Sequence, residues 1–167
     1  KAKGKNFLNL FSYTASASVY AAKGGARSSL SIDMSATYID WARHHFASNG
    51  INTRKHQLLT ADCLQWLEEA DEQFDLIYLD PPTFSNSKRM HSTLDVQRDQ
   101  VQLIGYALDL LSENGELIFV TNHQRFKLDE AVFVEHGWQP ENITAQTLDV
   151  DFQRSKKIHQ CWLFRRA

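Results

Sequence analysis

The sequence has little of what marks several protein classes. Its 167 residues contain only two cysteines, Cys63 and Cys161, which are far apart and in no metal-ligand spacing. A disulfide framework and a Cys/His zinc site are therefore disfavoured. No apolar run approaches the length of a membrane span, and the first residues show no signal-peptide pattern. The expected setting is a reducing cytoplasm, with neither membrane contact nor bound metal.

The chain also lacks a strong net charge. Its formal charge of −2 gives no overall basic field, so a nucleic-acid site would have to be a local patch. The length suits one well-buried domain and is short for two. The chain begins "KAKGKNFLNLF", within a few residues of a strand. That start predicts a single domain, residues 1–167, cut from a longer polypeptide whose missing N-terminal portion would be a partner.

Short apolar runs alternate with stretches of helical periodicity. Two further strand-like runs, 142–150 and 158–165, have no helix between them and predict an antiparallel hairpin joined by residues 151–157. "SENG" at 112–115 and "EHGW" at 135–138 are typical of helix ends. This order predicts an α/β domain with a mostly parallel seven-stranded sheet and helices on both faces. The five earlier strands are expected at 7–11, 29–33, 56–62, 74–80 and 116–121.

Ligands of an open parallel sheet bind beyond the carboxyl ends of its strands. The first strand is followed by "SYTASAS", small and hydroxylated residues that allow close approach of a ligand to the backbone. The alternative is that Ser12 or Thr14 simply caps a helix. The dinucleotide fingerprint G-x-G-x-x-G is absent, which weakens a nicotinamide-dependent oxidoreductase as an interpretation.

Acidic residues end the next three strands. Asp33 stands where an acid hydrogen-bonds the ribose hydroxyls of an adenosine-type ligand, and Asp62 could accept from an adenine amino group. Asp80 follows the fourth strand and precedes Pro81 and Pro82. For Asp33 or Asp62 taken alone, the alternative is that the carboxylate caps the following helix. A helix cap does not explain why consecutive strands all end in polar residues of this kind.

These motifs resemble those of class I S-adenosylmethionine (SAM) methyltransferases, which have a Rossmann-like fold. "LNLFSYTASAS", "SIDMS" and "TADCLQWL" resemble the family's cofactor segments, and "DPPTF" resembles the catalytic loop of enzymes that methylate nucleic-acid bases. "DVQRD" and "DFQRSKKIHQCW" are similar to the C-terminal half of bacterial 23S ribosomal RNA guanine methyltransferases. The resemblance implies 23S rRNA as the substrate and SAM as the cofactor, held by Phe11, Ser12, Tyr13, Thr14, Asp33, Met34, Asp62, Cys63 and Asp80.

One position departs from the family pattern. The family usually has a glycine after "SYT", where this chain has Ala15. Alanine suits a helix and tolerates most conformations with φ below zero, so we expect cofactor binding to be retained.

The catalytic residues implied by the resemblance are Asp80, Pro81, Pro82 and Phe84. A base to be methylated is swung out of its stack and held in a pocket. Tandem prolines fix the backbone around the Asp80 carboxylate, and Phe84 would stack on the base. The alternative is that the prolines only stop the strand while Phe84 packs into the core.

Basic residues follow three of the strands. They predict a phosphate-binding footprint at the ligand edge if the sixth strand is parallel to the first five, although lysine and arginine are common in any loop. The predicted substrate-binding residues are Lys88, Arg89, Arg98, Arg125, Lys127, Arg154 and Lys156.

The methylated atom follows from chemistry. Methylation of cytosine C5 needs a cysteine nucleophile, which related RNA enzymes place after the fourth or the fifth strand. The segments at those places, "DPPTFS" and "VTNHQ", contain no cysteine, so this chemistry is disfavoured. The N7 lone pair of guanine needs no proton removed, so positioning suffices and N7 is favoured. Methylation of an exocyclic nitrogen (guanine N2 or adenine N6) stays open. A catalytically silent RNA-binding module is the alternative from another class.

Overall fold

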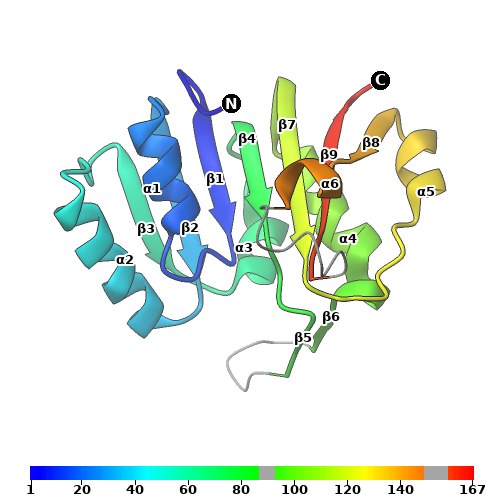
Figure 1. Cartoon of the computed structure of the whole chain (residues 1–167), viewed down its shortest axis with the longest axis horizontal. Coiled ribbons are helices and arrows are strands. Elements are labelled where there is room, and N and C mark those ends of the chain that lie inside the picture. Colours follow the sequence, from blue (N-terminus) through cyan, green and yellow to red (C-terminus); the bar gives the residue numbers. More distant parts are fainter. Residues whose placement is uncertain (87–92, 149–157) are drawn as a thin grey trace.

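A seven-stranded sheet forms the centre of the structure (Figure 1). The computed structural model of the chain describes residues 1–86, 93–148 and 158–167. The strands are arranged in the order β3-β2-β1-β4-β7-β9-β8. Their bounds are β1 Asn6–Leu10, β2 Ser28–Asp33, β3 His56–Thr60, β4 Phe74–Leu79, β7 Leu111–Thr121, β8 Trp138–Asn142 and β9 Gln160–Arg166.

The first five of these strands run in one direction. β1 pairs in parallel with β2 and β4, β2 with β3, and β4 with β7, whereas β9 is antiparallel to both β7 and β8. The carboxyl ends of β1, β2, β3, β4 and β7 therefore share one edge of the sheet. The chain winds outward from β1 in both directions, which puts a topological switch point between β1 and β4. The predicted α/β architecture is confirmed.

Helices cover both faces of this sheet (Figure 1). Three of them, α1 (Ser16–Lys23), α2 (Ala36–Ser48) and α6 (Thr144–Thr147), lie on one face, over small apolar clusters. The other three, α3 (Cys63–Glu69), α4 (Val96–Asp109) and α5 (Glu130–Glu135), lie on the opposite face, over the largest cluster.

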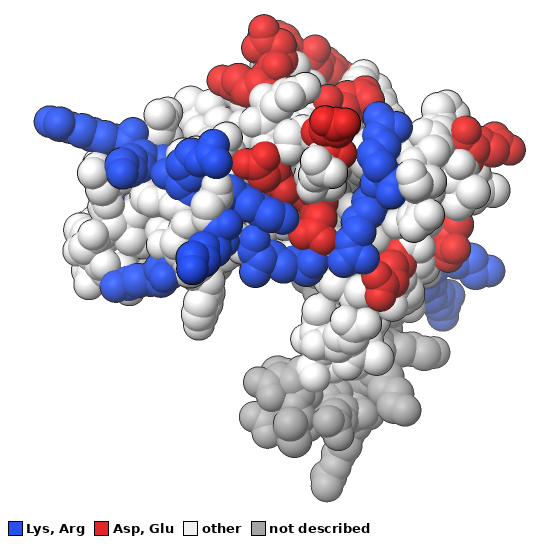
Figure 2. All heavy atoms as spheres, turned by 90° about the horizontal axis from the view of Figure 1, so that it is seen from above, with Lys and Arg blue, Asp and Glu red and all other residues white. Residues whose placement is uncertain are grey.

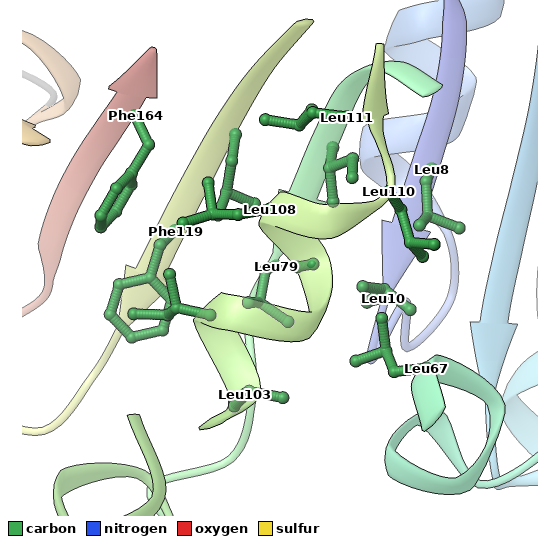
Figure 3. Packing of buried hydrophobic residues seen from close by; sticks show 14 of the residues in the cluster. Leu8, Leu10, Leu67, Leu79, Leu103, Leu108, Leu110, Leu111, Phe119 and Phe164 are labelled. Carbon is green, nitrogen blue, oxygen red and sulfur yellow. The ribbon is translucent and has the colours of Figure 1, made fainter. Parts of the chain in front are cut away.

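The main core lies between β1, β4, β7 and β9 and the helices α3 and α4 (Figure 3). Alternate residues of each strand face it, and α4 turns a stripe of apolar residues toward it. Full burial of each such side chain stabilises the fold by about 1.5–3 kcal/mol. Residues of this core include Leu8, Leu10, Leu67, Leu79, Leu103, Leu108, Phe119 and Phe164.

A second, two-stranded sheet follows β4 and was not predicted. Its strands, β5 (Phe84–Ser85) and β6 (Leu94–Asp95), pair in antiparallel fashion and lie beyond the carboxyl edge of the main sheet (Figure 1). The Val96 N–H donates to the Thr83 carbonyl (3.1 Å), which joins the base of this β5–β6 arm to α4.

The C-terminal pair of strands differs from the prediction. β8 is Trp138–Asn142, earlier than the predicted run 142–150, and Thr144–Thr147 of that run forms α6. The predicted joining segment, 151–157, lies outside the described residues. β8 is nevertheless parallel to β7 because both are antiparallel to β9. The end of β8 therefore lies at the same edge of the sheet as the carboxyl ends of the first five strands. The predicted phosphate-binding footprint depends on this direction.

The segment "SENG" is also placed differently. Helix α4 ends at Asp109, and residues 112–115 lie inside β7. Leu111 pairs with Phe74 but Glu116 pairs with Leu76, so the extra residues form an irregularity in the strand. A Cβ at Gly115 would lie 2.9 Å from the Ser112 carbonyl oxygen, which explains why glycine occupies this position.

Candidate cofactor and catalytic site

A cavity of about 600 Å³ lies at the carboxyl edge of the sheet, beside the switch point. Its volume is within the range of small-molecule sites. The loops that follow β1, β2, β3, β4 and β7 supply its walls, together with the first turn of α2. The lining residues are Phe11, Tyr13, Asp33, Met34, Ser35, Tyr38, Asp62, Cys63, Asp80, Pro81, Pro82 and Asn122.

The loop after β1 has an unusual backbone. Phe11, Tyr13 and Ala15 all have positive φ (56°, 51° and 56°), whereas the residues between them do not. The N–H groups of this loop are largely used within the protein, since those of Phe11, Ser12, Tyr13 and Ala15 donate to the Cys63 sulfur, the Ile32 carbonyl, the Asp33 carboxylate and the Ser12 carbonyl. Ala15 thus has a left-handed backbone and not one of the conformations with φ below zero that suit alanine, and the expectation that cofactor binding is retained stays a prediction. A left-handed alanine costs about 1–2 kcal/mol.

Buried polar contacts hold this loop in place. The Asn9 side chain donates to Ser18 (2.9 Å), whose hydroxyl bonds to that of Ser31 (2.7 Å), so β1, α1 and β2 are joined beneath the loop. The Ser12 N–H donates to the Ile32 carbonyl (2.9 Å). Ala15 is the residue before α1, and no side chain caps that helix, so the alternative of a Ser12 or Thr14 cap is wrong.

Asp33 joins two of the loops. One carboxylate oxygen accepts from the Tyr13 N–H and the other from the Ser35 N–H, both at 2.9 Å. Each oxygen keeps a further lone pair for a ligand hydroxyl. The cap of α2 is Ser35, which accepts from the Tyr38 N–H (3.3 Å), so the helix-cap alternative for Asp33 is wrong.

Asp62 caps a helix and also lies in the cavity lining, so the cap is confirmed and the contact with adenine stays a prediction. Its Oδ1 accepts from the Leu64 N–H (2.9 Å) and caps α3, while the side chain also lines the cavity. Cys63 follows it. The Phe11 N–H donates to the thiol sulfur (3.2 Å), and the thiol donates to the Ile32 carbonyl (3.5 Å). Burial raises the pKa of the Cys63 thiol, so the group is a structural thiol and not a nucleophile.

Asp80 is the most perturbed acid of the cavity. Burial raises its pKa to about 6, although the Tyr78 hydroxyl, as a hydrogen-bond donor, lowers it. Its backbone N–H points to the Leu10 carbonyl (3.5 Å), which keeps the end of β4 beside the end of β1. Pro81 and Pro82 form an apolar wall next to the carboxylate. The site therefore combines one acceptor with a poorly hydrated surface.

Phe84 lies outside the cavity lining, in the β5–β6 arm. Its side chain is 57% exposed, so the alternative that it packs into the core is wrong. Phe84 pairs with Asp95, which caps α4 by accepting from two backbone N–H groups of its first turn. An exposed aromatic ring thus stands on an anchored arm, two residues after the proline pair.

The predicted phosphate-binding residues are only partly described. The Arg98 guanidinium is engaged by the Asp99 carboxylate (2.6 and 2.8 Å), whereas Arg125 and Lys127 are exposed in the loop after β7. None of these three residues lines the cavity. The other four, Lys88, Arg89, Arg154 and Lys156, lie outside the described residues.

The cavity includes three residues that were not predicted as site residues: Ser35, Tyr38 and Asn122. Asn122 directly follows β7, so the rule that ligand residues come after strand ends would have found it. The Tyr38 ring meets that of Tyr13 edge-on, with centroids 4.5 Å apart. This contact joins the loop after β1 to the first turn of α2 and has no signal in the sequence.

An adenosine-type ligand fits the donors and acceptors present. Asp33 and Asp62 offer fixed carboxylate oxygens for hydroxyl and amino groups, and Phe11 and Tyr13 of the loop after β1 line the same cavity. The Ser12 hydroxyl is buried in that loop with no hydrogen-bond partner among the described residues. Predicted cofactor residues Ser12 and Thr14 lie beneath the cavity and not in its lining; the other seven line it.

A sequence profile of the family described as Conserved hypothetical protein 95 matches residues 1–130. The chain belongs to this family. Proteins called "Ribosomal RNA large subunit methyltransferase K/L" are 54% identical over 162 residues in Aliivibrio fischeri (strain MJ11) and 58% identical over 165 residues in Cellvibrio japonicus (strain Ueda107). These alignments cover 97% and 98% of this chain but only 23% and 22% of those proteins. The chain thus spans under a quarter of the curated relatives that it matches.

Solved structures support the fold. The crystal structure of SMU.776 complexed with SAH has a TM-score of 0.85 and 30% identity, covering 99% of this chain and 46% of that one. The ribosomal protein L11 methylase from Lactobacillus delbrueckii subsp. bulgaricus has a TM-score of 0.70 at 20% identity, covering 99% of this chain and 72% of that one. The resemblance seen in the motifs is confirmed.

Two features are absent from the described residues. No helix there has the length and apolar character needed to cross a membrane. In the same residues, no three or more His, Cys, Asp or Glu side chains are grouped so that they could hold a metal ion.

Proposed function

We propose that this chain is the methyltransferase domain of a longer ribosomal RNA large-subunit methyltransferase, and that it methylates guanine N7 in 23S rRNA with SAM as the cofactor. The observation that carries the proposal is the cavity in which Asp33, Asp62 and Asp80 converge from the ends of three parallel strands of one sheet, β2, β3 and β4. Relatives named as such methyltransferases match nearly the whole chain, and the rest of the polypeptide would be a partner.

The cofactor would lie along the strand ends. Asp33 would bind the ribose hydroxyls with the lone pairs left free by the Tyr13 and Ser35 amides. Asp62 would accept from the adenine amino group, and the loop after β1 would approach the amino-acid part. When bound, SAM supplies an electrophilic methyl group on a sulfonium.

The target base would lie between Asp80 and the β5–β6 arm. Because the N7 lone pair of guanine lies in the ring plane and carries no proton, the protein needs only to align the base and exclude water. The ionised Asp80 carboxylate would accept from N1–H or from the amino group of guanine. Pro81 and Pro82 would keep water from the reacting atoms, and Phe84 would stack on the base.

A buried acceptor also suits an exocyclic nitrogen, which becomes nucleophilic as it loses conjugation to the ring. In either chemistry, Asp80 acts in its ionised form. We therefore expect methyl transfer to rise with pH through about 6, the pKa of Asp80. A flat profile between pH 5 and pH 8 would remove this role of Asp80.

Two substitutions separate cofactor binding from base binding. Asp33→Asn replaces an acceptor by an amide that cannot serve all its partners, and we expect at least tenfold weaker SAM binding in calorimetry. Phe84→Ala should leave SAM binding unchanged. Loss of about 1–3 kcal/mol of stacking should slow RNA methylation roughly 5- to 150-fold.

Val134→Ala is the matched control for Phe84→Ala. Val134 is 58% exposed on α5, close to the exposure of Phe84, and it is far from the cavity lining. Equal methylation rates for the two variants would overturn the stacking role. If the unaltered chain binds no SAM at all, the silent RNA-binding module becomes the better interpretation.

A further inference from the structure

Basic side chains gather at the edge of the sheet opposite the cavity. Figure 2 looks onto this edge and shows a band of Lys and Arg side chains running across it. The strands β1, β2 and β3 begin here, α1 ends here, and the antiparallel β9 brings its last residues to the same edge. We call this surface the amino-edge band; it consists of Lys1, Lys3, Lys5, Lys23, Arg27, Lys55 and Arg165.

Backbone hydrogen bonds fix these residues relative to one another. The Gly4 N–H donates to the Gly25 carbonyl and the Arg27 N–H to the Lys5 carbonyl, both at 2.8 Å. The Ser29 N–H donates to the Lys55 carbonyl (3.0 Å). The starts of three adjacent strands are therefore joined, and their cations form one surface.

Carboxylates neutralise part of this charge. Burial raises the pKa of Asp75, but hydrogen bonds and the charges of Arg27 and Lys5 outweigh that effect, so this carboxylate acts on two cations of the band. Glu116 pairs with Lys1 (2.8 Å), Lys5 (3.0 Å) and Arg165 (2.9 Å). Burial raises its pKa, but hydrogen bonds from these three cations outweigh that effect and hold the pKa at about 2. The carboxylate therefore stays ionised, and three cations share it, although Arg165 also pairs with Glu141 (3.2 Å).

The other four cations of the band, Lys3, Lys23, Arg27 and Lys55, are exposed. They make no ion pair within 4.0 Å to any carboxylate of residues 1–86, 93–148 or 158–167. Since the whole chain has a formal charge of −2, this surplus is local and does not follow from net charge.

An exposed aromatic ring accompanies the cations. Tyr20 is 80% exposed and lies three residues before Lys23, hence one turn away on the same face of α1. Neighbouring strands lie about 4.8 Å apart, so the cations at the starts of β1, β2 and β3 span roughly 10 Å. Cations in a row beside an exposed aromatic ring are typical of surfaces that bind single-stranded nucleic acid.

We propose that the amino-edge band is a second RNA-binding surface, which contacts backbone phosphates of the substrate RNA at the sheet edge opposite the cavity. This inference rests on the proposed function. β1 has five residues, which at about 3.3 Å per residue separate the two edges by roughly 17 Å. Only an RNA long enough to pass around the domain would reach both surfaces.

The test measures RNA affinity as a function of salt. Lys3→Gln, Arg27→Gln and Lys55→Gln are combined stepwise in the 167-residue chain, and a 23S rRNA fragment is titrated at several salt concentrations. Each lost phosphate contact should reduce the slope of log affinity against log salt by about 0.7–0.9, hence by about 2 for the triple variant. Arg43→Gln removes an exposed cation of α2, outside the band, and should leave the slope unchanged.

Two further readouts separate the possible failures. The triple variant should keep the SAM affinity and methylate a dinucleotide at the rate of the unaltered chain, because such a substrate is too short to reach the band. If the unaltered chain methylates RNA and the triple variant keeps the full salt slope, the band binds something else, such as an acidic protein surface, and only this inference fails. If the unaltered chain binds no RNA, the inference fails together with the proposed function.

Discussion

Replacement of Asp80 by asparagine should make the protein more stable at neutral pH while it removes the negative charge of the proposed acceptor. Burial holds the pKa of Asp80 at about 6, against an ordinary value of 3.8. Because the pKa is raised in the folded state, ionisation destabilises the fold. The loss of folding stability begins as the pH rises through 3.8 and is complete above about pH 6. A difference of about 2 pKa units at 1.36 kcal/mol each gives about 3 kcal/mol.

Urea unfolding at a series of pH values measures this effect. The free energy of unfolding of the Asp80→Asn variant should exceed that of the unaltered protein by about 2–3 kcal/mol more at pH 8 than at about pH 3, where Asp80 is mostly protonated in both states. Asp71→Asn removes an exposed charge and controls for the change in net charge. The reasoning would be refuted by a difference between Asp80→Asn and the unaltered protein that does not vary with pH.

Three further predictions concern stability and reactivity. Ala15→Gly should change the free energy of unfolding by less than about 1 kcal/mol, because relief of the left-handed backbone offsets the lost methyl packing. Ala21→Gly, inside helix α1, is the control. There the lower helix propensity of glycine and the lost methyl packing both destabilise the fold, by about 2 kcal/mol in urea unfolding. Gly115→Ala should cost about 1–3 kcal/mol through its clash with Ser112, whereas Gly105→Ala, in open space on α4, should stabilise slightly. Both cysteines should resist a thiol reagent until the protein is unfolded, since burial raises both pKa values, and rapid labelling of the folded protein would contradict this.

The sequence predicted the strands that are buried on both sides. β1, β2, β4 and β9 appear as apolar runs because a central strand needs apolar residues whatever its neighbours are. β8 was misplaced because it is an edge strand of mixed polarity, "WQPEN", which contains a proline. Its pairing depends on β9 and not on any periodicity of its own. The β5–β6 arm has two residues per strand, too few for a pattern.

The site was predictable wherever a residue follows a strand, because parallel strands bring their ends together. Asp33, Asp62 and Asp80 all line one cavity, as expected. The backbone of Ala15 could not be predicted, since its left-handed conformation is imposed by the loop that it closes. The raised pKa of Asp80 depends on burial beside Pro81 and Pro82, which a sequence does not measure.

Transfer of a labelled methyl group from SAM to undermodified ribosomal RNA, followed by nucleoside analysis, tests the central claim most directly. We expect the label in 7-methylguanosine, and none when the Asp33→Asn variant is used at SAM concentrations well below those it needs. Label in an exocyclic-nitrogen product would contradict the assignment to N7. Failure of the SAM-bound chain to label any RNA would contradict the claim that the convergent carboxylates form a methyl-transfer site.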